Sequence, residues 1–118
     1  MRTIILAAAV SALALPAFAQ ANVSIVGQAG FGNGAGTFQS GSGNVSATGQ
    51  LGDFNAAITD QTGNLNLSGT GQIGFGNDAT TTQNGLGNAS GTLQVGSGHQ
   101  ATTGQAGTGN VSITAQSD

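Results

Sequence analysis

Small and polar residues recur at every second position in short segments along most of the chain. In one segment Asn77, Ala79, Thr81 and Gln83 are spaced by two, and the residues between them vary from segment to segment. Residues spaced by two lie on the same face of a β-strand. Four residues that usually include Gly separate one segment from the next, and Gly accepts the positive φ of tight turns. The pattern predicts short strands with one constant and one variable face, joined by turns.

The strand-and-turn unit repeats every eleven residues. Gln closes each predicted strand: Gln28, Gln39, Gln50, Gln61, Gln72, Gln83, Gln94, Gln105 and Gln116. Asn opens each strand, except where His99 stands in its place: Asn22, Asn33, Asn44, Asn55, Asn66, Asn77, Asn88 and Asn110. Gly lies two residues after the first eight Gln residues: Gly30, Gly41, Gly52, Gly63, Gly74, Gly85, Gly96 and Gly107. A fixed period is the signature of a repeat architecture, and we expect the Gln and Asn positions to form self-assembly ladders and these Gly positions to form turns.

One position reveals a longer period, because it alternates between Ser and Ala: Ser24, Ala35, Ser46, Ala57, Ser68, Ala79, Ser90, Ala101 and Ser112. The structural unit is therefore a rung of 22 residues, with the order strand, turn, strand, turn. The nine predicted strands, from Asn22 to Gln116, make about four and a half rungs. Stacking them at roughly 4.8 Å per rung gives two facing parallel sheets of five and four strands. The expected fold is all-β, a parallel β-solenoid of the cross-β kind.

An eleven-residue period is also typical of a right-handed helical coiled coil. The chain contains 22 Gly residues, and each costs about 1 kcal/mol in a helix interior. Thr at the strand positions favours β-structure. These features exclude the helical interpretation.

The constant face is polar, whereas the larger apolar residues lie on the variable face. Burial of the apolar set would follow the usual rule. We expect the constant face inside, because a narrow gap between two sheets restricts side-chain size and requires hydrogen bonding at every rung, and stacked Asn and Gln amides supply both donors and acceptors. The sheet with Ser would then present an apolar outer stripe, suited to lateral bundling or adhesion: Val23, Ile25, Val45, Leu67, Leu93, Val111 and Ile113.

Residues 1–19 have the features of a secretory signal peptide. Arg2 precedes an apolar stretch over 4–15, and Ala17-Phe18-Ala19 forms a small-x-small cleavage pattern. The expected division is a signal peptide over 1–19 and a repeat solenoid over 20–118, so the mature protein is secreted. No later stretch is apolar enough to span a membrane.

Composition limits the function classes open to residues 20–118. They hold four Asp and no Lys or Arg, which excludes nucleic-acid binding through phosphate neutralisation. Leu, Ile, Val and Phe supply only 18 of these 99 residues, and the chain has no Cys for disulfides. A monomer with so few large apolar groups meets the entropic cost of folding poorly, which favours stacking on identical neighbours.

Candidate chemistry is sparse. No Ser-His-Asp grouping, paired carboxylates or phosphate-cradling loop is visible, so we expect no enzyme activity and no cofactor. His99 has no second His or Cys to complete a metal site, and the short Asp-bearing repeat of calcium solenoids is missing. The dispersed Asp residues serve either as gatekeepers that slow assembly or as aids to solubility. Phe31 and Phe75 occupy equivalent turns and predict turn packing or edge stacking.

The repeat Gln-x-Gly-x-x-Asn-x-Ala-x-x-x-Gln runs from Gln28 to Gln39, Gln50 to Gln61 and Gln72 to Gln83. It resembles the curlin repeat, found in the subunits of curli, the secreted bacterial amyloid fibres of the biofilm matrix. The resemblance implies a homopolymer built by templated strand addition at the cell surface. It also implies a nucleator subunit and an outer-membrane secretion pore as partners. The regular repeats, with no basic terminal segment, favour the major fibre subunit. In the curlin family Ser usually stands where this chain has Asn22 and its equivalents.

Two other functions fit parts of the pattern. A monomeric repeat adhesin would be expected to have polar capping ends, which the repeats lack. An ice-binding solenoid would need outward Thr pairs on a flat sheet. Thr80 and Thr82 form one such pair, and we expect that Asp60, Gln100 and Thr102 do not continue it.

Overall fold

The computed structural model describes residues 21–118, and the predicted signal peptide over 1–19 lies outside them. The described residues form nine strands and no helix. The strands are β1 (Val23–Ala29), β2 (Gly34–Ser42), β3 (Val45–Asp53), β4 (Ala56–Asn64), β5 (Leu67–Phe75), β6 (Asp78–Leu86), β7 (Ala89–Ser97), β8 (Gln100–Thr108) and β9 (Val111–Ser117).

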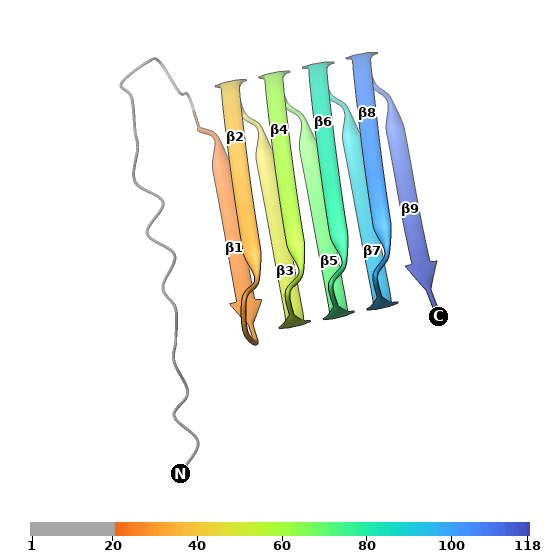
Figure 1. Cartoon of the computed structure of the whole chain (residues 1–118). Coiled ribbons are helices and arrows are strands. Elements are labelled where there is room, and N and C mark those ends of the chain that lie inside the picture. Colours follow the sequence, from red (N-terminus) through yellow and green to blue (C-terminus); the bar gives the residue numbers. More distant parts are fainter. Residues whose placement is uncertain (1–20) are drawn as a thin grey trace.

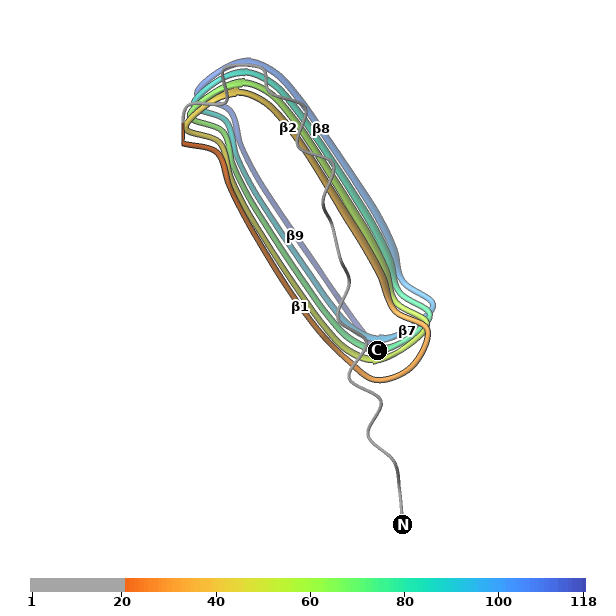
Figure 2. The same ribbon diagram turned by 90° about the vertical axis from the view of Figure 1, so that its left-hand side faces the viewer.

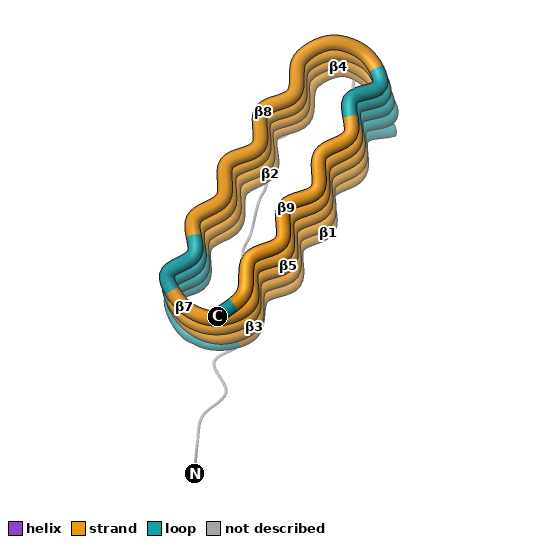
Figure 3. Tube along the Cα trace, turned by 90° about the vertical axis from the view of Figure 1, so that its right-hand side faces the viewer, coloured by secondary structure: helices purple, strands orange, loops and turns teal. Residues whose placement is uncertain are grey.

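The strands form two parallel sheets that face each other (Figure 1). One sheet has the order β1-β3-β5-β7-β9 and the other β2-β4-β6-β8. Each residue pairs with the residue 22 positions later, as Ser46 does with Ser68 and Ala57 with Ala79. Seen along the stack, the rungs superpose as flattened loops (Figures 2 and 3). The predicted parallel β-solenoid with 22-residue rungs is confirmed.

The constant polar face lies inside the solenoid, as expected. Gln61, Gln72, Gln83 and Gln94 are each 0% exposed, and the buried apolar residues of the described chain are three alanines of the four-stranded sheet. The large apolar residues point outward, with Ile113 83% exposed, except Val26, which occupies an inner slot that holds Thr48 in the next rung. Burial of the Gln and Asn amides costs free energy unless they are hydrogen-bonded, so the interior depends on the amide ladders described below.

The turns are shorter than the predicted four residues. From β2 onward only two residues separate one strand from the next, such as Gly43 and Asn44 between β2 and β3. Seven of the eight glycines expected in turns therefore lie inside strands, and only Gly30 lies outside: Gly41, Gly52, Gly63, Gly74, Gly85, Gly96 and Gly107. These eight glycines have φ between 102° and 127°, so each bends its strand while the pairing with the next rung continues.

Gly63 shows why this bend requires glycine. A Cβ built on Gly63 would overlap the carbonyl oxygen of Gly85, its partner in the next rung. The positive φ of 114° is a second obstacle to any other residue. The positive φ recurs at all eight of these glycines. The overlap with the carbonyl of the next rung recurs where a further rung follows, at Gly30, Gly41, Gly52, Gly74 and Gly85.

A second bend follows two residues later, in the left-handed region. This bend occurs at eight positions spaced eleven residues apart, from Gly32 to Gly109. Six of them hold Gly, and Phe54 and Leu65 occupy the other two, each with φ 57°. A non-glycine residue in this region costs about 1–2 kcal/mol. Both side chains lie against the glycine of the preceding rung, Phe54 beside Gly32 and Leu65 beside Gly43.

Candidate functional site: the amide ladders and the ends of the stack

A ladder of Gln side chains runs along each sheet. In the five-stranded sheet, Nε2 of Gln50 donates to Oε1 of Gln72 at 2.7 Å, and Nε2 of Gln72 donates to Oε1 of Gln94 at 2.8 Å. The ladder begins at Gln28 and ends at Gln116. The four-stranded sheet repeats the arrangement from Gln39 through Gln61 and Gln83 to Gln105.

The direction of the Gln ladder is set by a second hydrogen bond. Nε2 of Gln72 also donates to the backbone carbonyl of Ala56 on the opposite sheet, at 2.8 Å. Gln61 makes the same contact with the carbonyl of Val45, at 3.1 Å. Because a carbonyl oxygen only accepts, the amide nitrogen must face it. Every Gln amide therefore donates towards the C-terminal end of the stack.

The Asn ladder runs in the opposite direction. Asn66 donates to Oδ1 of Asn44 from its backbone N–H at 3.0 Å and from Nδ2 at 3.1 Å. Its Nδ2 also lies 3.2 Å from the carbonyl of Gly85. Each Asn thus ties the two-residue turn to the rungs on either side, which explains why Asn recurs at the loop position before each strand.

The two ends of the stack consequently present different groups. At the C-terminal end, Gln105 and Gln116 each use Nε2 on a backbone carbonyl, at 3.0 and 3.1 Å, and within residues 21–118 that nitrogen has no ladder acceptor. At the N-terminal end, Gln28 and Gln39 have Oε1 atoms that accept from no ladder donor in the described chain. Oδ1 of Asn110 is a further ladder acceptor at the C-terminal end. Donors at one end thus match acceptors at the other.

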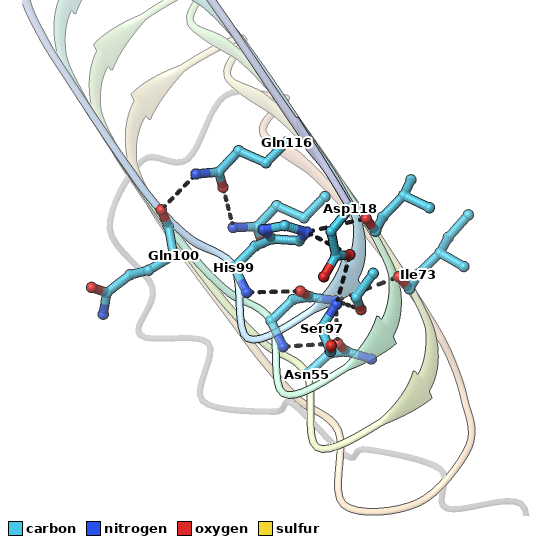
Figure 4. A network of polar contacts seen from close by, with 11 residues as sticks. Asn55, Ile73, Ser97, His99, Gln100, Gln116 and Asp118 are labelled. Atoms are coloured by element: carbon cyan, nitrogen blue, oxygen red, sulfur yellow. Dashed lines mark hydrogen bonds and ion pairs between the residues drawn. The ribbon is translucent and has the colours of Figure 1, made fainter.

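His99 modifies one corner of the C-terminal end (Figure 4). Its backbone N–H donates to Oδ1 of Asn77 at 3.1 Å, as an Asn in this position would. Its Nε2 lies 3.1 Å from the carbonyl of Val95 and 3.3 Å from Oδ1 of Asp118. Oδ1 of Asp118 also accepts from the N–H of Ser97, at 3.3 Å. The pairing of His99 with Asp118 was not foreseen from the sequence, because only the solenoid places residue 118 above residue 96.

Three Phe rings stack along one edge of the solenoid. Phe54 packs edge-on against Phe31 and Phe75, with centroids 5.6 and 5.5 Å apart. The expected stacking of Phe31 and Phe75 is present, but it runs through Phe54, which was missed, and Phe75 is the last residue of β5 rather than part of a turn. The signal of Phe54 in the sequence is a large residue in a slot where six of the eight repeats hold Gly and only Leu65 is a further exception.

Six buried hydroxyls have no hydrogen-bond partner among residues 21–118: Thr37, Ser46, Thr59, Ser68, Thr81 and Ser90. The Ser residues belong to the five-stranded sheet. In the four-stranded sheet Ala occupies the equivalent position. Hydrogen bonding therefore does not explain the alternation of Ser and Ala.

The outer face of the five-stranded sheet carries the predicted apolar stripe, and it is wider than expected. Leu51, Ile73 and Val95 form a further outward row. On the other sheet Thr80 pairs with Thr102, so the expectation that Thr102 does not continue the Thr row is wrong. Ile58 and Asp60 interrupt the Thr positions in the preceding strand, and no flat Thr array results.

Comparison with protein-family models and with curated protein sequences gave no match. Residues 21–118 contain no helix long and apolar enough to cross a membrane. The same residues contain no cluster of three or more His, Asp, Glu or Cys side chains that could hold a metal ion.

Proposed function

We propose that this chain is the structural subunit of a fibre that grows by adding copies end to end. The observation that carries the proposal is the complementarity of the two ends. Gln105 and Gln116 present amide N–H donors at one end, and Gln28 and Gln39 present amide oxygens at the other. A contact between two unlike surfaces does not close on itself in a straight stack, so it produces an open filament.

The backbone supports the same role. The outermost strands β1, β2, β8 and β9 each have one unpaired edge. An exposed parallel edge is a template for another strand. Within the chain each rung already pairs in this way with the next, so an added copy extends an existing pattern of hydrogen bonds. Templated strand addition is the mechanism this arrangement favours.

The curlin-like repeat adds a biological setting to the proposal. It favours a secreted functional amyloid of the biofilm matrix over an enzyme, with copies of the same chain as the main partner. A nucleator subunit and an outer-membrane secretion pore would be the further partners. The exposed apolar stripe is compatible with lateral bundling of such fibres.

Incubation of purified residues 20–118 from a monomeric state tests the proposal. We expect a lag, growth that added fibre fragments accelerate, and a fibre-diffraction reflection at about 4.8 Å along the axis. Protein that stays monomeric and β-structured for days, with seeds present, would refute the fibre function and favour the adhesin alternative.

A matched pair of variants tests the end complementarity itself. In Gln116→Glu the carboxylate still accepts from Gln94, but it can donate neither to an added copy nor to the backbone carbonyl of Gln100. Gln100→Glu places the same charge on the exposed outer face of the neighbouring strand. Growth should slow in the first variant and change little in the second.

A further inference from the structure

We infer that successive copies in the fibre are related by a half-turn about the fibre axis. This inference rests on the proposed fibre function and concerns the geometry of the junction. The described stack has nine strands, five in one sheet and four in the other. Because the number of strands is odd, an added copy can continue both sheets only if its five-stranded sheet continues the four-stranded sheet of the copy below, and its four-stranded sheet continues the five-stranded one.

The order of strands in the stack gives the reason. Every strand from β3 onward lies on the strand two places before it in the chain. The open position after β9 is therefore the one on top of β8, in the four-stranded sheet. The first strand of an added copy is β1, which belongs to the five-stranded sheet. It reaches the position on β8 only if the copy is rotated by a half-turn, and its β2 then lies on β9.

A junction without rotation leaves a gap. If β1 of the added copy lay on β9, its β2 would be two strand spacings from β8, on the order of 9–10 Å. The facing edges of β8 and β2 would have no strand between them. The Nε2 atom of Gln105 and the Oε1 atom of Gln39, which are the free ends of one Gln ladder, would be too far apart to bond.

The rotated junction brings both Gln ladders into register. Continuing the eleven-residue spacing places Gln105 beneath Gln28 of the added copy and Gln116 beneath Gln39. Asn110 then lies beneath Asn33, whose backbone N–H can donate to Oδ1 of Asn110, as Asn110 itself donates to Asn88 at 3.1 Å.

The remaining interior contacts fit by size. In the rotated junction Ala101 meets Ser24 and Thr103 meets Val26, all small or β-branched side chains. The fourth corner is the weakest, because His99 has no amide oxygen to accept the N–H of Asn22. The rotated junction thus satisfies three of the four ladder corners, and the unrotated one leaves a complete strand position empty.

The rotation also changes the outer surface of the fibre. The apolar stripe of the five-stranded sheet would lie on alternate sides in successive copies, about 22 Å apart along the axis for four and a half rungs. Each side of the fibre would carry apolar and more polar patches in turn. Without rotation, one side would be apolar along its whole length.

Disulfide trapping distinguishes the two junctions, because the chain contains no Cys of its own. Thr102 and Ile25 are exposed outward positions of β8 and β1, and they become direct neighbours across the rotated junction. Parallel neighbours at about 4.8 Å lie within the Cα range of a disulfide. The test variant is Thr102→Cys with Ile25→Cys. The comparison variant, Ile113→Cys with Ile25→Cys, reports the unrotated junction.

Neither pair can bridge within one copy. Residues 25 and 102 lie in different sheets, and β3, β5 and β7 separate Ile25 from Ile113. Each of the three single-Cys variants serves as the control for random contacts. Fibres are grown reduced, checked by diffraction, oxidised, dissolved and run on a non-reducing gel.

Covalent multimers of three or more copies from the 25/102 variant, with none from 25/113, are the expected result. Multimers from 25/113, or fibres that cross-link through neither pair, would overturn the rotation and leave the fibre function standing. If the unmodified chain and all variants fail to form fibres, the proposed function fails and the rotation fails with it.

Discussion

Replacement of Gln72 by Ala should be among the most destabilising substitutions in the solenoid, although Gln72 is polar. The side chain is fully buried and takes part in three hydrogen bonds, with Gln50, Gln94 and the carbonyl of Ala56. In Gln72→Ala, Oε1 of Gln94 loses its ladder donor. A buried acceptor left unpaired costs about 1–3 kcal/mol, and the other two lost bonds cost about 1 kcal/mol each.

The missing side-chain atoms add a cavity term of about 1 kcal/mol. The expected loss is therefore on the order of 4–6 kcal/mol, a large part of the stability of an ordinary domain. Urea unfolding of the monomer, followed by circular dichroism at a concentration too low for fibre growth, measures it as a shift of the midpoint.

Ser68→Ala is the matched control, because Ser68 lies on the same strand and the same buried face. Its hydroxyl has no partner among residues 21–118, and the equivalent slot of the other sheet holds Ala79 and Ala101. Removal of an unpaired buried hydroxyl should leave stability unchanged or raise it by about 1 kcal/mol. Equal losses in Gln72→Ala and Ser68→Ala would refute the view that directed amide bonds, rather than filled space, hold the interior.

Three further outcomes are expected. Leu65→Gly should raise stability by up to about 1 kcal/mol, because relief of the left-handed strain exceeds the entropy that Gly adds to the unfolded chain. Leu65→Ala keeps the strain and serves as the control, and thermal melting compares the two variants. Gly63→Ala should prevent folding, because its Cβ overlaps the carbonyl of Gly85, and the circular dichroism spectrum would show it. In Gly107→Ala the added Cβ meets no backbone atom within the chain, so the variant should fold with a loss of about 1–3 kcal/mol in stability from the backbone strain. Seeded growth should nevertheless slow, because this Cβ occupies the place of the next rung.

The repeat period predicted most of the fold, because an in-register parallel stack needs the same residue type at the same height in every rung. The pairing of Ser46 with Ser68 and of Gln50 with Gln72 follows directly from the 22-residue spacing. The polar interior was also predictable, since only a shared, confined environment explains why Gln recurs without change, and Asn with the one exception of His99, while apolar neighbours vary.

Other features could not be predicted from the sequence, because they depend on the path of the backbone. The strand ends were predicted too early, because Gly41 and its equivalents bend the chain without interrupting the ladder. The direction of the Gln ladder depends on a carbonyl of the opposite sheet, such as that of Ala56, and no spacing in the sequence reveals that contact. The contact of His99 with Asp118 is likewise a result of stacking.

The distribution of apolar residues acquires a physical meaning once the ladders are in place. Ile25 and Ile113 are 62% and 83% exposed, which would be a poor arrangement for a chain that folds alone. Amide ladders stabilise the interior, so the hydrophobic free energy of the outer stripe is not used within a copy and stays available between fibres. If copies alternate by a half-turn, that stripe appears on both sides of every fibre. Fibres should then bundle through both faces and form sheets or thick bundles, whereas fibres without rotation would pair through one face and stop at two.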